Sequence, residues 1–159
     1  MNLPAPEFDL RAYLLGTAAA GRAVEGNWAV ERQLLDRSTG THGTFTGVVR
    51  FSPTDDGGLS CREEGTMGWP TFTGPASREY VLEPADRPDA LDVFFADGRP
   101  FHRMSFTPEA SRDQHWCDPD TYRVTYTHNG PDRFSYSWDV TGPRKDLLLT
   151  SVLQRLPGG

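Results

Sequence analysis

Turn signals rich in glycine, proline and aspartate recur along most of the chain and divide it into short segments. The clusters STGTHG, PTDDGG, GWPTFTGP, PADRPD, ADGRP, HNGPD and TGPRKD separate runs in which apolar and polar residues alternate. Alternation with a period of two is typical of strands that bury one face, and turn clusters end such strands. This pattern predicts an all-β protein with eight to ten antiparallel strands over about residues 26–156.

The connections between the segments are short, which favours consecutive hairpins in an up-and-down order. A meander of this length is expected to close into a barrel, because closure removes the exposed sheet edges that promote aggregation. A barrel of this size has room for one small ligand. We therefore predict one domain over residues 1–159, with a short helix at about residues 8–20 that begins after Asp9 as its N-cap.

Composition and charge exclude several classes of partner. The formal net charge is -6 and the pI is about 5.1, whereas binding to a phosphate backbone needs clustered basic side chains, so we expect no nucleic-acid partner. We see neither an apolar run of about 18 residues nor a typical secretory signal, so we expect a cytoplasmic protein with no membrane partner. The sequence is compatible with a homodimer. Cys61 and Cys117 are expected to be free thiols.

The inward-facing line of each predicted strand carries unusually polar residues for a small core. Arg32 is in phase with Trp28, Glu63 is in phase with Cys61, and His102 lies in the return strand after the Asp-Gly turn. Buried charges are costly unless they are paired or face a ligand, so this composition points to a site. The other side chains predicted to face inward include Arg78, Tyr80, Met104, Tyr122, Val124, Tyr126, Phe134, Tyr136 and Trp138. Phe101, Arg103 and Ser105 are predicted to face the opposite side.

Gly26-Asn27-Trp28 resembles the G-x-W signature of lipocalins and related calycin barrels. In that superfamily an arginine from the last strand packs across the tryptophan, and Arg155 is similar in position. The stretches FFADGRPFH, HWCDPDTY and WDVTGPRKD further resemble an uncharacterised calycin-like family, over about residues 14–155. The resemblance implies a lipocalin-like barrel and brings no established reaction with it.

The residues favour acid/base chemistry as the leading hypothesis. His102 can exchange a proton near neutral pH, and Tyr122 or Glu63 is expected to orient it or to act as its counterpart. Arg32 and Arg78 would supply positive charge for an anionic group of the ligand. We therefore expect an isomerase, cyclase or lyase without a cofactor that acts on a small, partly apolar molecule. The predicted ligand-binding residues are Arg32, Arg78, Tyr80, His115, Cys117 and Trp138.

Several alternatives remain beside this hypothesis. The same barrel can serve as a non-catalytic carrier or sensor, or as a haem-binding barrel with His102 or His115 as axial ligand. His102, His115 and Cys117 can offer three ligands to a transition metal, although we predict no metal site, and Cys117 can act as a thiolate nucleophile. A buried polar network or a solidly packed interaction module would need no ligand. Lys145 is a candidate rim contact, and Arg99 is interpreted as an ordinary hairpin residue.

Overall fold

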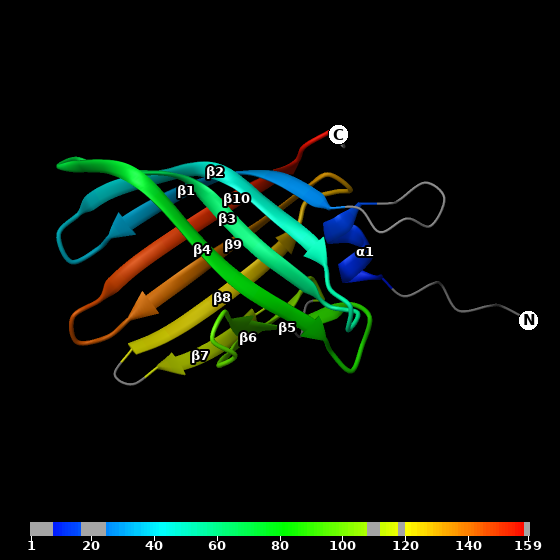
Figure 1. Cartoon of the computed structure of the whole chain (residues 1–159). Coiled ribbons are helices and arrows are strands. Elements are labelled where there is room, and N and C mark those ends of the chain that lie inside the picture. Colours follow the sequence, from blue (N-terminus) through cyan, green and yellow to red (C-terminus); the bar gives the residue numbers. More distant parts are fainter. Residues whose placement is uncertain (1–7, 17–24, 108–111, 118–119, 158–159) are drawn as a thin grey trace, which may run out of the picture.

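The computed structural model describes residues 8–16, 25–107, 112–117 and 120–157, and of residues 112–117 it describes only the backbone. One short helix precedes ten strands that form a single sheet (Figure 1). The elements are α1 (Leu10–Leu15), β1 (Gly26–Asp36), β2 (Thr41–Pro53), β3 (Leu59–Trp69), β4 (Phe72–Pro84), β5 (Ala90–Phe95), β6 (Pro100–Ser105), β7 (Arg112–Cys117), β8 (Asp120–His128), β9 (Arg133–Thr141) and β10 (Asp146–Arg155).

The sheet is antiparallel throughout, in the order β6-β5-β4-β3-β2-β1-β10-β9-β8-β7. Every strand pairs with its neighbours in sequence, except that β1 also pairs with β10 and that β6 and β7 form no ladder with each other. The sheet curls so that β6 and β7 lie next to each other (Figure 1). The predicted up-and-down barrel is therefore confirmed, in a nearly closed form.

The hairpin turns follow the predicted turn clusters with one informative difference. Gly98 has φ 92°, which places the Asp97-Gly98 pair in a tight turn between β5 and β6, as predicted. Between β3 and β4, however, only Pro70 and Thr71 lie outside the strands, and the register continues to Trp69 and Phe72. Cross-strand pairing therefore extends the strands into residues that local composition assigns to a turn.

The helix α1 closes one end of the barrel (Figure 1). Asp9 caps it as predicted, since its Oδ1 accepts a hydrogen bond of 3.0 Å from the amide of Ala12. The helix is shorter than the predicted span of residues 8–20, because it ends at Gly16, where φ is 85°; residues 17–20 lie outside the described part of the chain. Leu10 and Leu14 of this helix are fully buried. Within the described residues, no helix is both long and apolar enough to cross a membrane.

Trp28 forms the floor of this closed end. Its side chain is fully buried, and its indole Nε1 donates a hydrogen bond of 2.9 Å to the carbonyl of Leu14. Arg155 lies opposite Trp28 in the β1–β10 register, with its guanidinium carbon 4.3 Å from the centre of the indole ring. The cation–π contact implied by the family resemblance is thus present.

Candidate functional site

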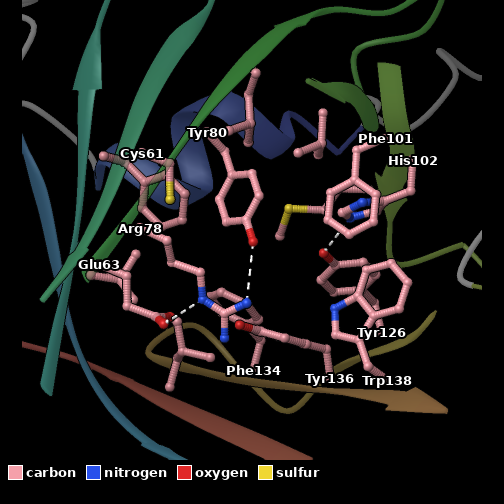
Figure 2. A pocket seen from close by; sticks show the side chains of 16 residues that line it. Cys61, Glu63, Arg78, Tyr80, Phe101, His102, Tyr126, Phe134, Tyr136 and Trp138 are labelled. Carbon is pink, nitrogen blue, oxygen red and sulfur yellow. Dashed lines mark hydrogen bonds and ion pairs between the residues drawn. The ribbon is translucent and has the colours of Figure 1, made fainter. Parts of the chain in front are cut away.

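A cavity of about 70 Å³ lies inside the barrel (Figure 2). This volume is enough for a few water-sized molecules. Strands on both sides of the β1–β10 pair contribute to its wall, so side chains distant in sequence converge on it. The lining residues are Val49, Phe51, Cys61, Glu63, Arg78, Tyr80, Leu82, Val93, Phe101, His102, Met104, Tyr126, Phe134, Tyr136, Trp138 and Leu153.

Arg32 lies behind this wall, and most of its hydrogen-bond donors are bound to other residues of the protein. Only 1% of its surface is exposed, and it donates from Nη1 to Glu63 Oε1 at 2.6 Å and from Nη2 to Glu63 Oε2 at 2.7 Å. Its Nε donates to Ser151 at 2.7 Å, and Nη2 also donates to Tyr136 Oη at 2.7 Å. Four of its five N–H groups are therefore used. Arg32 does not line the cavity and its donors are directed at the protein, so its predicted ligand-binding role stays a prediction that this geometry does not support.

Glu63 joins two arginines. Its Oε1 accepts from Arg32 and also from Arg78 Nε, at 3.0 Å. Burial alone would raise the pKa of this carboxyl, but the hydrogen bonds and positive charges of the two arginines outweigh burial and hold its pKa below the usual range. Glu63 is thus paired with the arginines rather than with His102, and its predicted catalytic role stays a prediction. One negative charge faces two positive charges, so this cluster carries an excess of one positive charge.

Arg78 differs from Arg32 in how much of its hydrogen-bonding capacity is used. Besides the bond to Glu63, it donates from Nη1 to Tyr80 Oη at 3.2 Å. Its side chain is 41% exposed, and its guanidinium points into the cavity (Figure 2). In the described part of the chain, Nη2 has no hydrogen-bond partner. Arg78 and Tyr80 therefore occupy the cavity wall as predicted.

His102 also lies in the cavity wall, on β6. Its Nε2 is 2.8 Å from Tyr126 Oη, and the rings of Phe101 and Trp138 meet it edge to face at 4.6 and 4.9 Å (Figure 2). The tyrosine beside His102 is thus Tyr126 and not the predicted Tyr122. Tyr122 is outside the cavity wall, and its hydroxyl accepts a hydrogen bond of 3.1 Å from Lys145 Nζ.

Phe101 reaches the cavity from a position that alternation assigns to the outer face. The β5–β6 register pairs Val93 with His102 but Phe94 with Pro100, so Phe101 is the extra residue of a β-bulge. Its ring stacks on Trp138 with centroids 4.9 Å apart and an angle of 5° between the planes. The bulge therefore places two successive side chains, Phe101 and His102, in the same wall.

Cys61 is a free thiol in the cavity wall. Burial raises its pKa to about 12, with a further contribution from the nearby charge of Glu63. A thiol in this state is a weak nucleophile at neutral pH. We therefore assign Cys61 to packing of the wall.

The remaining predicted residues lie away from this cavity or outside the described side chains. His115 and Cys117 belong to β7, of which only the backbone is described, so their predicted roles stay predictions. Among the side chains that are described, no three His, Cys, Asp or Glu groups gather as a metal site would require. Lys145 lies 3.4 Å from Asp120 and is half exposed. Arg99 is bound to Asp97 of its own hairpin at 2.7 Å, as expected for an ordinary turn residue.

Solved structures with the same fold show a nearly closed calycin-like barrel. The S-type phycobiliprotein lyase CPES from Guillardia theta is 11% identical, with a TM-score of 0.53 over 84% of this chain and 88% of that chain. A structure of EF1p2_mFAP2b bound to DFHBI is 17% identical, with a TM-score of 0.51 over 94% of this chain and 100% of that one. At such low identity the likeness establishes the fold, and confirms the predicted fold class.

No curated protein matches the sequence. The family resemblance is nevertheless supported at sequence level, over a range close to the one estimated from the motifs. Residues 24–155 match the family described as "Family of unknown function (DUF6314)", and the chain belongs to this family.

Proposed function

We propose that the barrel binds a small, partly apolar organic molecule in the cavity between Arg78 and His102. The observation that carries this proposal is the composition of the wall. Apolar side chains make up most of it, while a few polar groups from β4, β6, β8 and β9 converge on the same space. Small-molecule sites typically have this composition. The barrel of EF1p2_mFAP2b, which has the same fold, is bound to the small molecule DFHBI.

The size of the cavity limits what can bind. A porphyrin ring is far larger than a space of about 70 Å³, so haem does not fit this site without opening of the barrel. His102 Nε2, one of the two nitrogens that could ligate iron, is engaged with Tyr126. The site thus favours a compact molecule over a macrocyclic cofactor.

The test of binding is a screen of small organic compounds by saturation-transfer NMR. Val93→Phe adds a ring to a residue of the wall, whereas Val48→Phe makes the same change at a residue that is 38% exposed. We expect compounds that bind the wild type to lose binding in Val93→Phe and to keep it in Val48→Phe. Compounds that bind both variants equally would place binding outside the cavity and contradict the proposal.

We further propose that His102 exchanges a proton with the bound molecule through Tyr126, so that the barrel acts as an isomerase, cyclase or lyase without a cofactor. The specific support is the hydrogen bond of 2.8 Å between His102 and Tyr126 at the cavity surface. A histidine placed beside a phenol in a water-poor site is suited to general acid/base catalysis. In this mechanism the Tyr126 hydroxyl takes a proton from the molecule while it passes its own proton to His102 Nε2, and the reverse transfer returns a proton to the molecule.

Proton exchange can be detected before the physiological substrate is known. Compounds found in the screen that carry an acidic C–H bond are incubated with the protein in D2O, and deuterium uptake is measured by mass spectrometry. We expect both His102→Gln and Tyr126→Phe to retain binding and to lose the uptake, because each interrupts the path of the proton. Binding without uptake or conversion in the wild type would favour the alternative of a non-catalytic carrier.

A further inference from the structure

The two arginines that pair with Glu63 differ in how many hydrogen-bond donors they leave available for a ligand. Arg32 directs four N–H groups at Glu63, Ser151 and Tyr136 and is 1% exposed. Arg78 uses two N–H groups in the described part of the chain, and its side chain is 41% exposed. The excess positive charge of the cluster is therefore presented to the cavity at Arg78.

Among the side chains that the structure describes, Glu63 is the only acid that lines this cavity. Because Glu63 already accepts hydrogen bonds from both arginines, it neutralises only one of them. A positive charge that is partly shielded from water by apolar walls attracts an anion more strongly than an exposed charge does. The unbalanced charge thus selects for a negatively charged group in the ligand.

Tyr80 supplies a second donor beside Arg78. Its hydroxyl oxygen accepts from Arg78 Nη1, which leaves its proton free to point elsewhere. Burial raises the pKa of Tyr80, so the phenol stays protonated at neutral pH and can donate. A guanidinium N–H and a phenol O–H side by side can hold the two oxygens of a carboxylate.

The opposite part of the wall is aromatic. Phe101 and Trp138 stack in parallel, and Trp138 turns its indole nitrogen toward the cavity, across from the Arg78 guanidinium (Figure 2). In the part of the chain that the structure describes, this indole N–H has no hydrogen-bond partner. A ligand held at Arg78 by its acid group would therefore place a flat body against this aromatic wall.

We propose that the cavity selects a small organic acid with a flat apolar body, and that Arg78, assisted by Tyr80, binds its carboxylate. This inference rests on the proposed function, because it names the class of molecule that the same site accepts. Arg32 does not take part in recognition and instead positions Arg78 through the shared carboxylate of Glu63.

The test compares acids with their neutral amides. Crotonate, tiglate and 2-furoate, three flat acids small enough for a compact site, are each titrated beside the corresponding primary amide, with binding followed by NMR shifts of the tryptophan indole N–H groups. For the wild type we expect each acid to bind at least about tenfold more tightly than its amide, since hydrogen bonds between charged groups are the stronger ones. Arg78→Met should remove this preference, and Tyr80→Phe should reduce it about threefold.

Arg62→Met is the matched control. Arg62 is the neighbour of Glu63 on β3, but its side chain faces outward, where it pairs with Glu64 and Glu79. The same loss of one positive charge should there leave the preference for acids within about twofold, because the distance and the solvent screen it. If Arg78→Met did not fold, Tyr80→Phe would still test the donor pair.

The results that would contradict this inference differ from those that would contradict the proposed function. Equal binding of acids and amides to the wild type, or a preference that persists in Arg78→Met, would overturn this inference and leave the proposed small-molecule site intact. Binding of none of the six compounds would instead contradict the proposed function. An equal loss in Arg62→Met and Arg78→Met would show that net charge, and not the site, sets the preference.

Discussion

The closed end of the barrel and the cavity each contain a tryptophan and an arginine, but use them differently. At the closed end, Trp28 is fully buried and donates to Leu14, and Arg155 donates to Asp132 and to the backbone. In the cavity, Trp138 and Arg78 keep part of their surface exposed and direct polar atoms into open space. Trp28 fills the protein interior and Arg155 covers its ring from the end of the barrel, whereas Trp138 and Arg78 border the cavity inside the barrel.

This difference separates residues that stabilise the barrel from residues that can bind a ligand. A polar group that is satisfied within the protein contributes to folding and has little left to offer a ligand. A group with spare donors near an apolar wall is costly for a core and useful for recognition. Substitutions at matched residues of the two regions should therefore change different properties.

The largest expected effect separates the two tryptophans. Trp28→Ala should lower the free energy of unfolding by roughly 3–5 kcal/mol, because it empties a fully buried indole site. Trp138→Ala should cost only about 1–2 kcal/mol, since that ring is partly exposed already. Urea denaturation followed by circular dichroism measures both.

Two results bear on this comparison. If Trp28→Ala fails to fold, Trp28→Phe keeps an aromatic ring but removes the bond to Leu14 and part of the ring volume, and should cost about 1–2 kcal/mol. Equal losses at Trp28 and Trp138 would show that the cavity wall is packed as tightly as the closed end, and the distinction between the two regions would fall.

The next effect separates the two arginines. Arg32→Met should cost about 3 kcal/mol, because it leaves the carboxylate of Glu63 buried with only Arg78 to pair with. Arg78→Met should cost less than about 1 kcal/mol, since that side chain is 41% exposed and Glu63 keeps Arg32 as its partner. Chemical denaturation of both variants at neutral pH measures the contrast.

A double variant sharpens the interpretation of Arg32. Replacing Arg32 and Glu63 together by methionine removes both charges, and replacement of a buried ion pair by apolar side chains is often neutral. We expect the double variant to regain most of the stability lost in Arg32→Met. A larger loss in Arg78→Met than in Arg32→Met would reverse the roles assigned to the two side chains.

Sequence alternation predicted the barrel and the inward-facing lines well, because the period of a strand determines which face a residue occupies. Arg32, Glu63, Arg78 and His102 were all expected inside, and all four lie there. Alternation does not determine which partner lies across the barrel. It therefore could not show that both carboxylate oxygens of Glu63 accept hydrogen bonds from Arg32, or that Arg78 keeps a donor available for a ligand.

Two errors have a clear geometric origin. Tyr122 and Tyr126 share a face of β8, but four residues separate them by about 13 Å along a strand, and only the stagger of neighbouring strands decides which one meets His102. The inward turn of Phe101 depends on the β-bulge opposite Phe94, which interrupts alternation without a marked sequence signal. Tyr126 was predicted to face inward, so alternation could predict that it is buried. Alternation could not predict that its partner is His102.

The smallest expected effect concerns the acid dependence of the Arg32–Glu63–Arg78 cluster. Glu63→Gln should cost about 1–3 kcal/mol at pH 7, because the buried Arg32 loses its charged partner. The pKa of Glu63 is lower in the folded protein than its ordinary value, so the unfolded chain takes up the proton first as the solution is acidified. The stabilisation by this carboxylate is complete above its unfolded pKa of about 4.3 and is lost as the pH falls through the lower folded value.

Urea denaturation between pH 7 and pH 3 should therefore show that acid lowers the stability of the wild type more steeply than that of Glu63→Gln. Glu31→Gln, at an exposed site on β1, should follow the wild type. Parallel curves for the wild type and Glu63→Gln would mean that Glu63 is not held as a carboxylate by the two arginines, and the assignment of the excess charge to Arg78 would lose its basis.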